Sequence, residues 1–463
     1  MHPLKDASMR EFDPQSPVSL GTLARSLAGK VKSREAVIGV VGLGYVGLPI
    51  GLEFAKKEFN VLGFDVSAQK VDMLHAGENY NEDLPDADIA AVSKNGRLKA
   101  TTDFSRLSEA DVIFICVPTP FNANKDPDLS FIEQASEKVG EALRRGQLVI
   151  LKSTTFPGTT EEYMVPILER SGLRTGEDFF VAFSPERVDP GNKAFHTGNT
   201  PIVVGGVGPE STYLASLANH AIIEKVYMVS NPKIAEMEKL LENIFRSVNI
   251  ALVNELALLC ERMKGIDIWE VIEAAATKPF GYMKFLPGPG IGGHCIPIDP
   301  YYLSWLARAY DFETRFITLS ANTNESMPYH VTGKVVHIIA HQPIALADAR
   351  VLVIGATFKK NVKDMRHSPA EPIIRHLMVS GVGHIDVADP WLPEYEANGR
   401  VFKCLEINSE MLKTYHCAVI VTDHDAFDPQ MIAEHSRFVV DTRNMLRDVT
   451  KGREKIILLG STL

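Results

Sequence analysis

Paired cysteines, a net positive charge and apolar runs long enough to span a membrane are all lacking in this sequence. The 463 residues include five cysteines and no CxxC pair, and the formal net charge is −10 at pH 7. A disulfide framework or a cysteine-rich zinc site is therefore not expected, and no metal site is predicted. The negative charge argues against a general nucleic-acid binder. The cysteines are scattered at Cys116, Cys260, Cys295, Cys404 and Cys417.

Sorting signals are missing as well. No continuous apolar run reaches the roughly 20 residues that a membrane-spanning helix needs, and the N-terminus lacks the apolar core of a signal peptide. We therefore expect a cytoplasmic protein with no membrane partner. Residues 1–34 are predicted to be an extension with one amphipathic helix, capped at Ser16-Pro17. No chemistry is assigned to this extension.

Glycine and proline, by contrast, are concentrated in one stretch, LPGPGIGGHCIPIDP, at Leu286–Pro300. The prolines and glycines exclude a helix or a central strand there, and a ligand can approach glycine backbone closely. The loop delivers one thiol, Cys295, and one carboxylate, Asp299, which suits covalent catalysis. A surface turn with an inert buried cysteine is the alternative that these residues alone leave open.

A dinucleotide site is predicted near the N-terminus. The apolar run AVIGVV at residues 36–41 leads into a GxGxxG loop, a helix-like segment, and a second strand at residues 60–64 that ends in an acid. Gly42 permits the tight turn, Gly44 lets the backbone approach a pyrophosphate, and Gly47 allows close helix packing. The predicted cofactor contacts are Gly42, Gly44, Tyr45, Val46, Gly47 and Asp65. The carboxylate would bind ribose hydroxyls and repel a 2′-phosphate, which favours NAD over NADP.

Further buried strands are predicted at residues 111–117, 147–151 and 178–183. In open α/β sheets ligands bind at the carboxyl ends of the strands, so the polar loops that follow are candidates to line one crevice. Ordinary strand–helix loops are the alternative. The candidate residues in these loops are Pro118, Thr119, Ser153, Thr154, Glu186 and Arg187.

A long helix is predicted from Asn231-Pro232, an N-cap with proline at the first helical position, to a stop at Gly265. Such a rod can join two domains or form a dimer seam. Lys239, Asn243 and Arg246 fall on one face of it. On an isolated helix these three could equally be a solvated stripe.

Strands at residues 350–355, 385–388, 417–421 and 438–440 predict a second Rossmann-like domain without a GxGxxG loop. Lys359 and Arg443 follow strand ends, where an anionic ligand would be held, and Arg366 is a third cation nearby. Plain surface charges are the alternative.

The predicted fold class is α/β, with two Rossmann-like doubly wound domains joined by a long central helix and a helical middle domain. The chain is too long for one core. The expected parts are an extension (residues 1–34), an NAD-binding domain (35–229), a central helical domain (230–341) and a last domain (342–463).

Eight short motifs occur along the chain, once each: GLGYVG, VPTP, KSTTFPGTT, SPER, KLLEN, GGHCIPIDP, GATFKK and DMRHSP. Together they resemble those of the UDP-glucose/GDP-mannose dehydrogenase family, and the resemblance covers nearly all of the chain after about Val37. It implies oxidation of a nucleotide sugar's C6 hydroxymethyl to a carboxylate, with two hydrides passed to two NAD⁺. It also implies that Cys295 forms a thiohemiacetal and then a thioester, which water cleaves.

The resemblance implies roles for the other candidates. Lys239 matches the lysine that assists proton movement and stabilises the oxyanion, and Asn243 matches the asparagine beside it. Asp299 matches the carboxylate that activates water, while Thr154 and Glu186 complete the water and proton path.

The family likeness also divides the remaining residues between substrate and cofactor. Arg366 matches an NAD contact, and Lys359 and Arg443 match cations that bind substrate from the last domain. The implied substrate-binding residues are Glu186, Arg187, Lys239, Asn243, Leu286, Pro287, Gly288, Gly290, Gly292, Lys359 and Arg443.

Two departures from the UDP-glucose pattern, His294 before the cysteine and Ile298 before the aspartate, resemble the branch that acts on UDP-N-acetylhexosamines. UDP-N-acetyl-D-glucosamine, in bacterial surface-polysaccharide (O-antigen or capsule) synthesis, is the first expectation. UDP-N-acetylgalactosamine, UDP-N-acetylmannosamine and UDP-glucose stay open. The family's interprotomer arginine has no clear match; Lys278 or Lys284 could replace it in the expected homodimer or larger homo-oligomer.

Two other functions compete with this interpretation. A two-electron dehydrogenase of the hydroxyacid type would need no thiol and would release one NADH per turnover. A non-catalytic nucleotide-sugar sensor would bind NAD and UDP-sugar without producing NADH.

Overall fold

The computed structural model describes residues 9–15, 18–81, 83–122, 125–187, 189, 191–192, 194–293, 296 and 299–462. The chain divides into two compact units, Met1–Glu242 and Asn243–Leu463. The finer division expected from the sequence, with boundaries after residues 34, 229 and 341, stays a prediction. Cys295, His294 and Ile298 lie outside the described residues.

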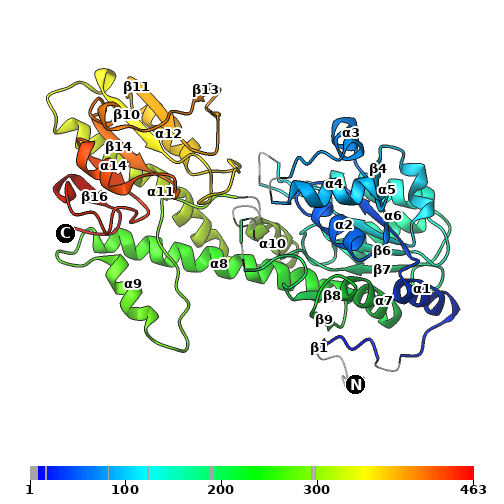
Figure 1. Cartoon of the computed structure of the whole chain (residues 1–463). Helices are drawn as coiled ribbons and strands as arrows, with labels where there is room; N and C mark the ends of the chain where they lie inside the picture. The colour runs from blue at the N-terminus through cyan, green and yellow to red at the C-terminus, as the bar shows by residue number, and fades with distance from the viewer. Residues whose placement is uncertain are drawn as a thin grey trace. The chain divides into compact units, whose positions relative to one another are not determined.

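The first unit is built on a sheet with the strand order β1-β9-β8-β7-β6-β5-β2-β3-β4 (Figure 1). The six strands from β4 to β7 in this order are parallel. Their order is that of a dinucleotide-binding doubly wound sheet, which reverses between β2 and β5. The strands are β1 (Arg10–Glu11), β2 (Val37–Val41), β3 (Asn60–Phe64), β4 (Leu98–Thr101), β5 (Val112–Ile115), β6 (Leu148–Leu151), β7 (Phe180–Phe183), β8 (Ile202–Gly206) and β9 (Val226–Val229).

Apolar side chains cover both faces of this sheet, because successive strand residues point to opposite sides. Ile38 and Val40 of β2 lie in one core, whereas Val41 lies in the other. A buried sheet of this kind needs helices on both faces. The helices are α1 (Thr22–Ser33), α2 (Gly47–Lys56), α3 (Ala68–Ala76), α4 (Asp86–Lys94), α5 (Ser130–Ala142), α6 (Val165–Glu169) and α7 (Pro209–His220), with short turns η1 (Phe104–Glu109) and η2 (Thr159–Met164).

The five strands predicted in this part of the chain are confirmed, each within two residues of its expected ends. The predicted helix start, Ser16-Pro17, lies outside the described residues, and the helix of this extension begins later. Helix α1 begins at Thr22, and the N–H of Gly21 donates to the carboxylate of Glu210, 2.5 Å away. A residue 189 positions away satisfies the helix end, so the local capping signal did not decide where the helix starts.

Helix α8 (Pro232–Cys260) contains the boundary between the two units. Its predicted N-cap is confirmed, because the N–H of Ile234 donates to Asn231 Oδ1 over 3.1 Å. The helix ends four residues before the predicted Lys264. By length and composition α8 could cross a membrane, contrary to the expectation that no such stretch exists. This is weak evidence, because the long helix of a soluble protein passes the same test.

The second unit carries a parallel sheet with the order β11-β10-β14-β15-β16 and a separate β12-β13 pair (Figure 1). This order, 2-1-3-4-5 along the chain, is the other common doubly wound arrangement. The four strands predicted here are confirmed within one residue; β12, β13 and β16 were not predicted. The strands are β10 (Arg350–Ile354), β11 (His384–Ala388), β12 (Glu394–Ala397), β13 (Arg400–Lys403), β14 (Cys417–Ile420), β15 (Val439–Asp441) and β16 (Ile456–Leu458).

Helices of the second unit pack against its sheet. Val331, Val335 and Ile339 of α11 pack into the core beside β10. The helices are α9 (Ile268–Ala276), α10 (Asp299–Ala307), α11 (Arg315–Ala340), α12 (Ala370–Val379), α13 (Ser409–Leu412) and α14 (Pro429–His435), with turns η3 (Arg308–Tyr310), η4 (Leu346–Asp348) and η5 (Arg453–Lys455).

Candidate active site

The glycine-rich loop after β2 has the geometry that a dinucleotide requires. Gly42 has φ +91°, and a Cβ there would lie 2.7 Å from the carbonyl oxygen of Cys116. A Cβ on Gly47 would lie 1.9 Å from the carbonyl oxygen of Gly42. At Gly44 nothing lies within 4 Å of the Cβ position. The first and third glycines are therefore needed for packing, whereas the second leaves open space where a pyrophosphate can approach.

Helix α2 starts directly after this loop, with Val46 at its N-cap and no acidic residue in its first turn. Tyr45, beside it, is an exposed side chain. An uncapped helix N-terminus presents backbone N–H groups that favour phosphate. The residues present thus fit the pyrophosphate of NAD.

Asp65 follows β3 and is buried beside the loop. Its carboxylate accepts the N–H of Leu43 and the N–H of Ser67, each over 2.9 Å, and Lys70 Nζ lies 3.3 Å away. Sequence reasoning identified the acid but missed Lys70, although the cation stands only five residues later. The structure therefore shows that the acid also anchors the glycine-rich turn.

Tyr80 holds the other side of the same turn. Its hydroxyl donates to the carbonyl oxygen of Leu43 over 2.8 Å, and Lys70 Nζ lies 5.8 Å from the ring centre. Burial, and secondarily Asp65, raise the pKa of this phenol, so it stays a hydrogen-bond donor. Both peptide groups of Leu43 are thus held by side chains, and no sequence pattern pointed to Tyr80.

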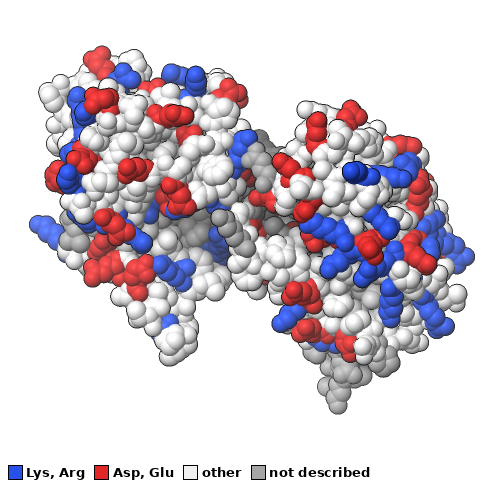
Figure 2. All heavy atoms as spheres, in the orientation of Figure 1, with Lys and Arg blue, Asp and Glu red and all other residues white. Residues whose placement is uncertain are grey.

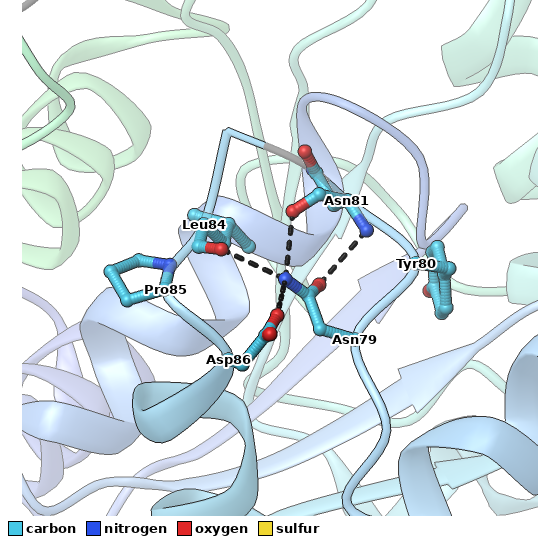
Figure 3. Close-up of a pocket in the computed structure, with 6 residues that line it drawn as sticks. All are labelled: Asn79, Tyr80, Asn81, Leu84, Pro85 and Asp86. Carbon is cyan, nitrogen blue, oxygen red and sulfur yellow. Dashed lines mark hydrogen bonds between the residues drawn. The ribbon is translucent and has the colours of Figure 1, made fainter.

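Tyr80 belongs to a loop that lines a cavity of about 460 Å³ (Figure 3). The side-chain amide of Asn79 donates to Asn81 O, Leu84 O and Asp86 Oδ1 over 2.8–2.9 Å, so this one residue ties the loop together.

We predict that Asp65→Ala weakens NAD binding about tenfold or more. The variant loses an acceptor for the ribose and the anchor of the Leu43 N–H, and one hydrogen bond to a charged group contributes roughly 1.5–3 kcal/mol. Calorimetric titration with NAD measures the effect. Asp72→Ala, an exposed position on α3, is the matched control. Unchanged NAD affinity in Asp65→Ala would remove this residue from the ribose role.

Strands β5 and β6 are neighbours in the sheet, so the loops that follow them meet at one edge. Ser153 Oγ donates to the carbonyl oxygen of Val117 over 2.7 Å, immediately before Pro118. Thr119 and Thr154 are both half-buried. The structure therefore brings these candidate residues together.

The loop after β7 sends its two charged residues in different directions. Glu186 lies 3.7 Å from the buried Lys152 Nζ and accepts the backbone N–H of Arg187 over 2.9 Å. The Arg187 guanidinium pairs with Glu238 and, over 2.7 Å, with Glu242 of helix α8. Burial and Glu242 raise the pKa of Glu238 to about 7 against the effect of Arg187.

Helix α8 carries the next two candidates one turn apart. Lys239 is buried in the first unit. In the second unit, Asn243 Nδ2 donates to Asp299 Oδ2 over 2.5 Å. Asp299 is the first residue of α10 and is buried; the positive end of a helix dipole favours a carboxylate there. Arg246 lies on the same helix, and its contacts with the described residues give it no role.

The described part of the glycine-rich loop, residues 286–293, packs against the rest of the second unit. The N–H of Gly288 donates to Asn254 Oδ1, and Asn254 Nδ2 donates to Asn324 Oδ1, each over 2.9 Å. Both asparagines are buried. Sequence reasoning missed these two residues as well; polar side chains on the buried face of two helices were the available signal.

The cations of the last domain lie along this loop. A Cβ on Gly288 would lie 2.6 Å from Arg443 Nη1, and the N–H of Gly293 donates to the carbonyl oxygen of Arg366 over 3.2 Å. The Arg366 guanidinium forms a bidentate pair with Asp364 over 2.7 and 2.8 Å. Lys359 stands in the loop after β10, where its carbonyl oxygen accepts from the Thr357 hydroxyl.

Two further glycines of the loop pack so closely against neighbouring residues that a side chain would be crowded. A Cβ on Gly292 would lie 2.6 Å from Phe358 Cβ, and one on Gly290, which has φ +134°, would lie 3.4 Å from Pro328. Leu286 is exposed. Acidic and basic side chains are interspersed over the visible face of both units (Figure 2).

Four of the five cysteines can be compared directly. Burial raises the pKa of Cys116, Cys404 and Cys417 to about 12 and also raises that of Cys260. Each is therefore a neutral thiol at physiological pH and a poor nucleophile. The predicted nucleophile, Cys295, lies outside the described residues.

Comparison with known proteins identifies the family to which the chain is similar. Three models of the UDP-glucose/GDP-mannose dehydrogenase family match in succession: the NAD binding domain over residues 36–231, the central domain over 233–326 and the UDP binding domain over 352–448. The solved structure of a UDP-D-ManNAc dehydrogenase from Pyrococcus horikoshii superposes with a TM-score of 0.83 at 32% identity, covering 92% of this chain and 99% of that one.

Relatives named for different sugars are similar to nearly the same degree. The chain is 36% identical to a UDP-N-acetyl-D-glucosamine 6-dehydrogenase of Pseudomonas aeruginosa over 90% of this chain and 97% of that protein. It is 34% identical to an NDP-N-acetyl-D-galactosaminuronic acid dehydrogenase of Ralstonia nicotianae over 88% and 96%. With its NAD-binding fold and its UDP-binding domain, the chain belongs to the UDP-glucose/GDP-mannose dehydrogenase family and is an NAD-dependent nucleotide-sugar dehydrogenase.

Proposed function

We propose that this enzyme oxidises the C6 hydroxymethyl of UDP-N-acetyl-D-glucosamine to the uronic acid through a covalent intermediate on Cys295. The observation that supports this most directly is the hydrogen bond between Asn243 and Asp299. It holds a buried carboxylate four residues after the cysteine. Hydrolysis of a thioester needs a base that orients water, and a buried carboxylate at this position can serve as that base.

The proposed sequence balances as two oxidations and one hydrolysis. The C6 alcohol loses a hydride and a proton to give the aldehyde, and the Cys295 thiolate adds to its carbonyl carbon to form a thiohemiacetal. Loss of a second hydride gives the thioester, and water then releases the carboxylate and the thiol. Bound NAD⁺ supplies the hydride acceptor for each oxidation, so one sugar consumes two NAD⁺ and one water.

The residues of this chain are assigned to proton and charge movement. The Lys239 ammonium stabilises negative charge on the C6 oxygen, and Asn243 orients Asp299. Thr154 and Glu186 complete the water and proton path. Arg443 and Lys359 bind the diphosphate together with residues 286–292.

The choice among sugars rests on the cysteine loop. Sequence identities of 36%, 35% and 34% to relatives named for N-acetylglucosamine, N-acetylmannosamine and N-acetylgalactosaminuronic acid do not separate the three. His294 and Ile298 distinguish the loop from the UDP-glucose pattern. We therefore place UDP-N-acetyl-D-glucosamine first, in surface-polysaccharide synthesis, with the other two N-acetylated sugars and UDP-glucose as alternatives.

Exposed apolar residues on α8 support a cytoplasmic homodimer or larger homo-oligomer. Leu241, Phe245, Leu252 and Leu259 recur at helical spacing and are between 47% and 60% exposed. A seam of this kind buries well against a second copy. Of the two lysines considered for the interprotomer arginine, Lys284 pairs with Glu273 and Lys278 lies over the ring of Phe280.

The test is a count of NADH released per sugar consumed, for a panel of UDP-sugars. We expect two NADH per UDP-N-acetyl-D-glucosamine, and a kcat/KM at least about tenfold above that for its epimers, because a single polar contact in a binding site provides that discrimination. One NADH per turnover would support the hydroxyacid-type alternative. No NADH from any UDP-sugar would support a non-catalytic sensor.

A further inference from the structure

Lys152, the first residue after β6, is almost completely buried, with 2% of its surface exposed. Lysine is rarely buried without a partner, because an ammonium loses its hydration there. Its Nζ lies 3.7 Å from Glu186 Oε2 and 3.4 Å from the hydroxyl oxygen of Ser184. Both partners come from the loop that follows the neighbouring strand β7. The lysine therefore sits beneath the loop that carries the predicted proton-path glutamate.

The electrostatic surroundings of Lys152 connect it to two proposed reaction residues. Burial lowers the pKa of its ammonium, and Glu186 and Cys116 oppose that effect; Lys239 on α8 lowers it further. The charges of both Glu186 and Lys239 thus act on Lys152, with opposite effects on the pKa of its ammonium. No part of the mechanism above uses it.

The side chain of Arg187, the cation next to Glu186 in the sequence, is engaged by other partners. The Arg187 guanidinium is held by Glu238 and Glu242 and also donates to Pro201 O over 2.8 Å, while the Arg187 backbone N–H donates to Glu186. The loop after β7 therefore uses one residue to dock on α8 and the other to meet Lys152. The Arg187 backbone N–H donates to Glu186 Oε1 over 2.9 Å, and the Lys152 ammonium lies 3.7 Å from Glu186 Oε2 as an ion pair.

We propose that Lys152 is a positioning residue for the dehydrogenase reaction: its ammonium holds the Glu186 carboxylate in the orientation that the proton path requires. The proposal rests on the roles assigned to Glu186 and Lys239 under the proposed function. It adds a residue that touches neither substrate nor cofactor and acts through Glu186.

The first test replaces the ammonium with an apolar chain of similar length. Lys152→Met is expected to lower kcat for UDP-sugar oxidation at least about tenfold, because general acid–base groups contribute 10²–10⁴-fold when correctly placed. The KM values for sugar and NAD are expected to change less than threefold. Lys152→Gln keeps a hydrogen-bond donor and is expected to recover part of kcat. Lys138→Met removes a lysine–glutamate pair on the exposed face of α5 and is the matched control.

A double-mutant cycle separates positioning from a structural role. If Lys152 acts through Glu186, adding Lys152→Met to Glu186→Gln costs little further activity, since interacting residues are not additive. Losses that multiply in the double variant, or an unchanged kcat in Lys152→Met, would overturn the proposal. So would a Lys152→Gln variant as slow as Lys152→Met with an unchanged denaturation midpoint.

The outcome stays separate from that of the proposed function. Failure of the wild-type enzyme to oxidise any UDP-sugar would reject the function itself. Two NADH per sugar in the wild type, with full activity in Lys152→Met, would reject only the positioning role.

Discussion

Cys295→Ala is expected to stop net uronic-acid formation, lowering it at least about a thousandfold, while NAD affinity stays unchanged. Without a thiol no thioester forms, and loss of a covalent nucleophile removes the step that the rest of the site serves. The other cysteines cannot substitute, because burial raises the pKa of Cys116, Cys404 and Cys417 to about 12. Quantifying the uronic acid by mass spectrometry measures the effect.

Cys404→Ala is the control for this experiment. Cys404 is half-buried and has no assigned role, so its variant should keep wild-type activity. In the wild type, rapid quenching during turnover should trap a sugar-linked adduct on the peptide that contains residue 295. Acid formation near the wild-type rate in Cys295→Ala would reject the covalent scheme, and so would a quenched, turning-over enzyme without the adduct.

Arg443→Met is expected to raise the KM for the UDP-sugar about ten- to hundredfold and to leave the KM for NAD within about twofold. The guanidinium lies against Gly288 of the glycine-rich loop, and its Nε donates to Val421 O over 2.8 Å, which fixes its direction. A hydrogen bond to a charged group contributes roughly 1.5–3 kcal/mol, which gives this range. Steady-state kinetics with each substrate varied in turn measures both constants.

Two further variants make this experiment decisive. Arg437→Met, on the exposed surface just before β15, should leave both constants unchanged. Gly288→Ala keeps the charge but places a methyl group 2.6 Å from Arg443 Nη1, so it should also raise the sugar KM. If Arg443→Met instead raises the KM for NAD more than that for the sugar, this arginine belongs to the cofactor side.

Local sequence patterns predicted the strands, the turn of the NAD site and the start of α8, because these features depend on residues close together in the chain. Runs of β-branched residues marked the strands of both sheets, since a parallel sheet covered on both faces needs continuous apolar strands. The spacing from the glycines to Asp65 marked the NAD site, because that turn and strand have a fixed length. Asn231-Pro232 marked the start of α8. The start of α1 could not be predicted, because its first N–H is satisfied by Glu210, far along the chain.

The sequence by itself thus determined the fold class and the family. Tertiary structure alone decided the partnerships: Lys70 and Tyr80 at the turn after β2, Asn254 and Arg443 at the loop of residues 286–293, and Lys152 beside Glu186. These contacts join residues that have no fixed spacing in the chain. Burial makes each of them necessary, because a polar group removed from water must find its partner wherever the fold brings one.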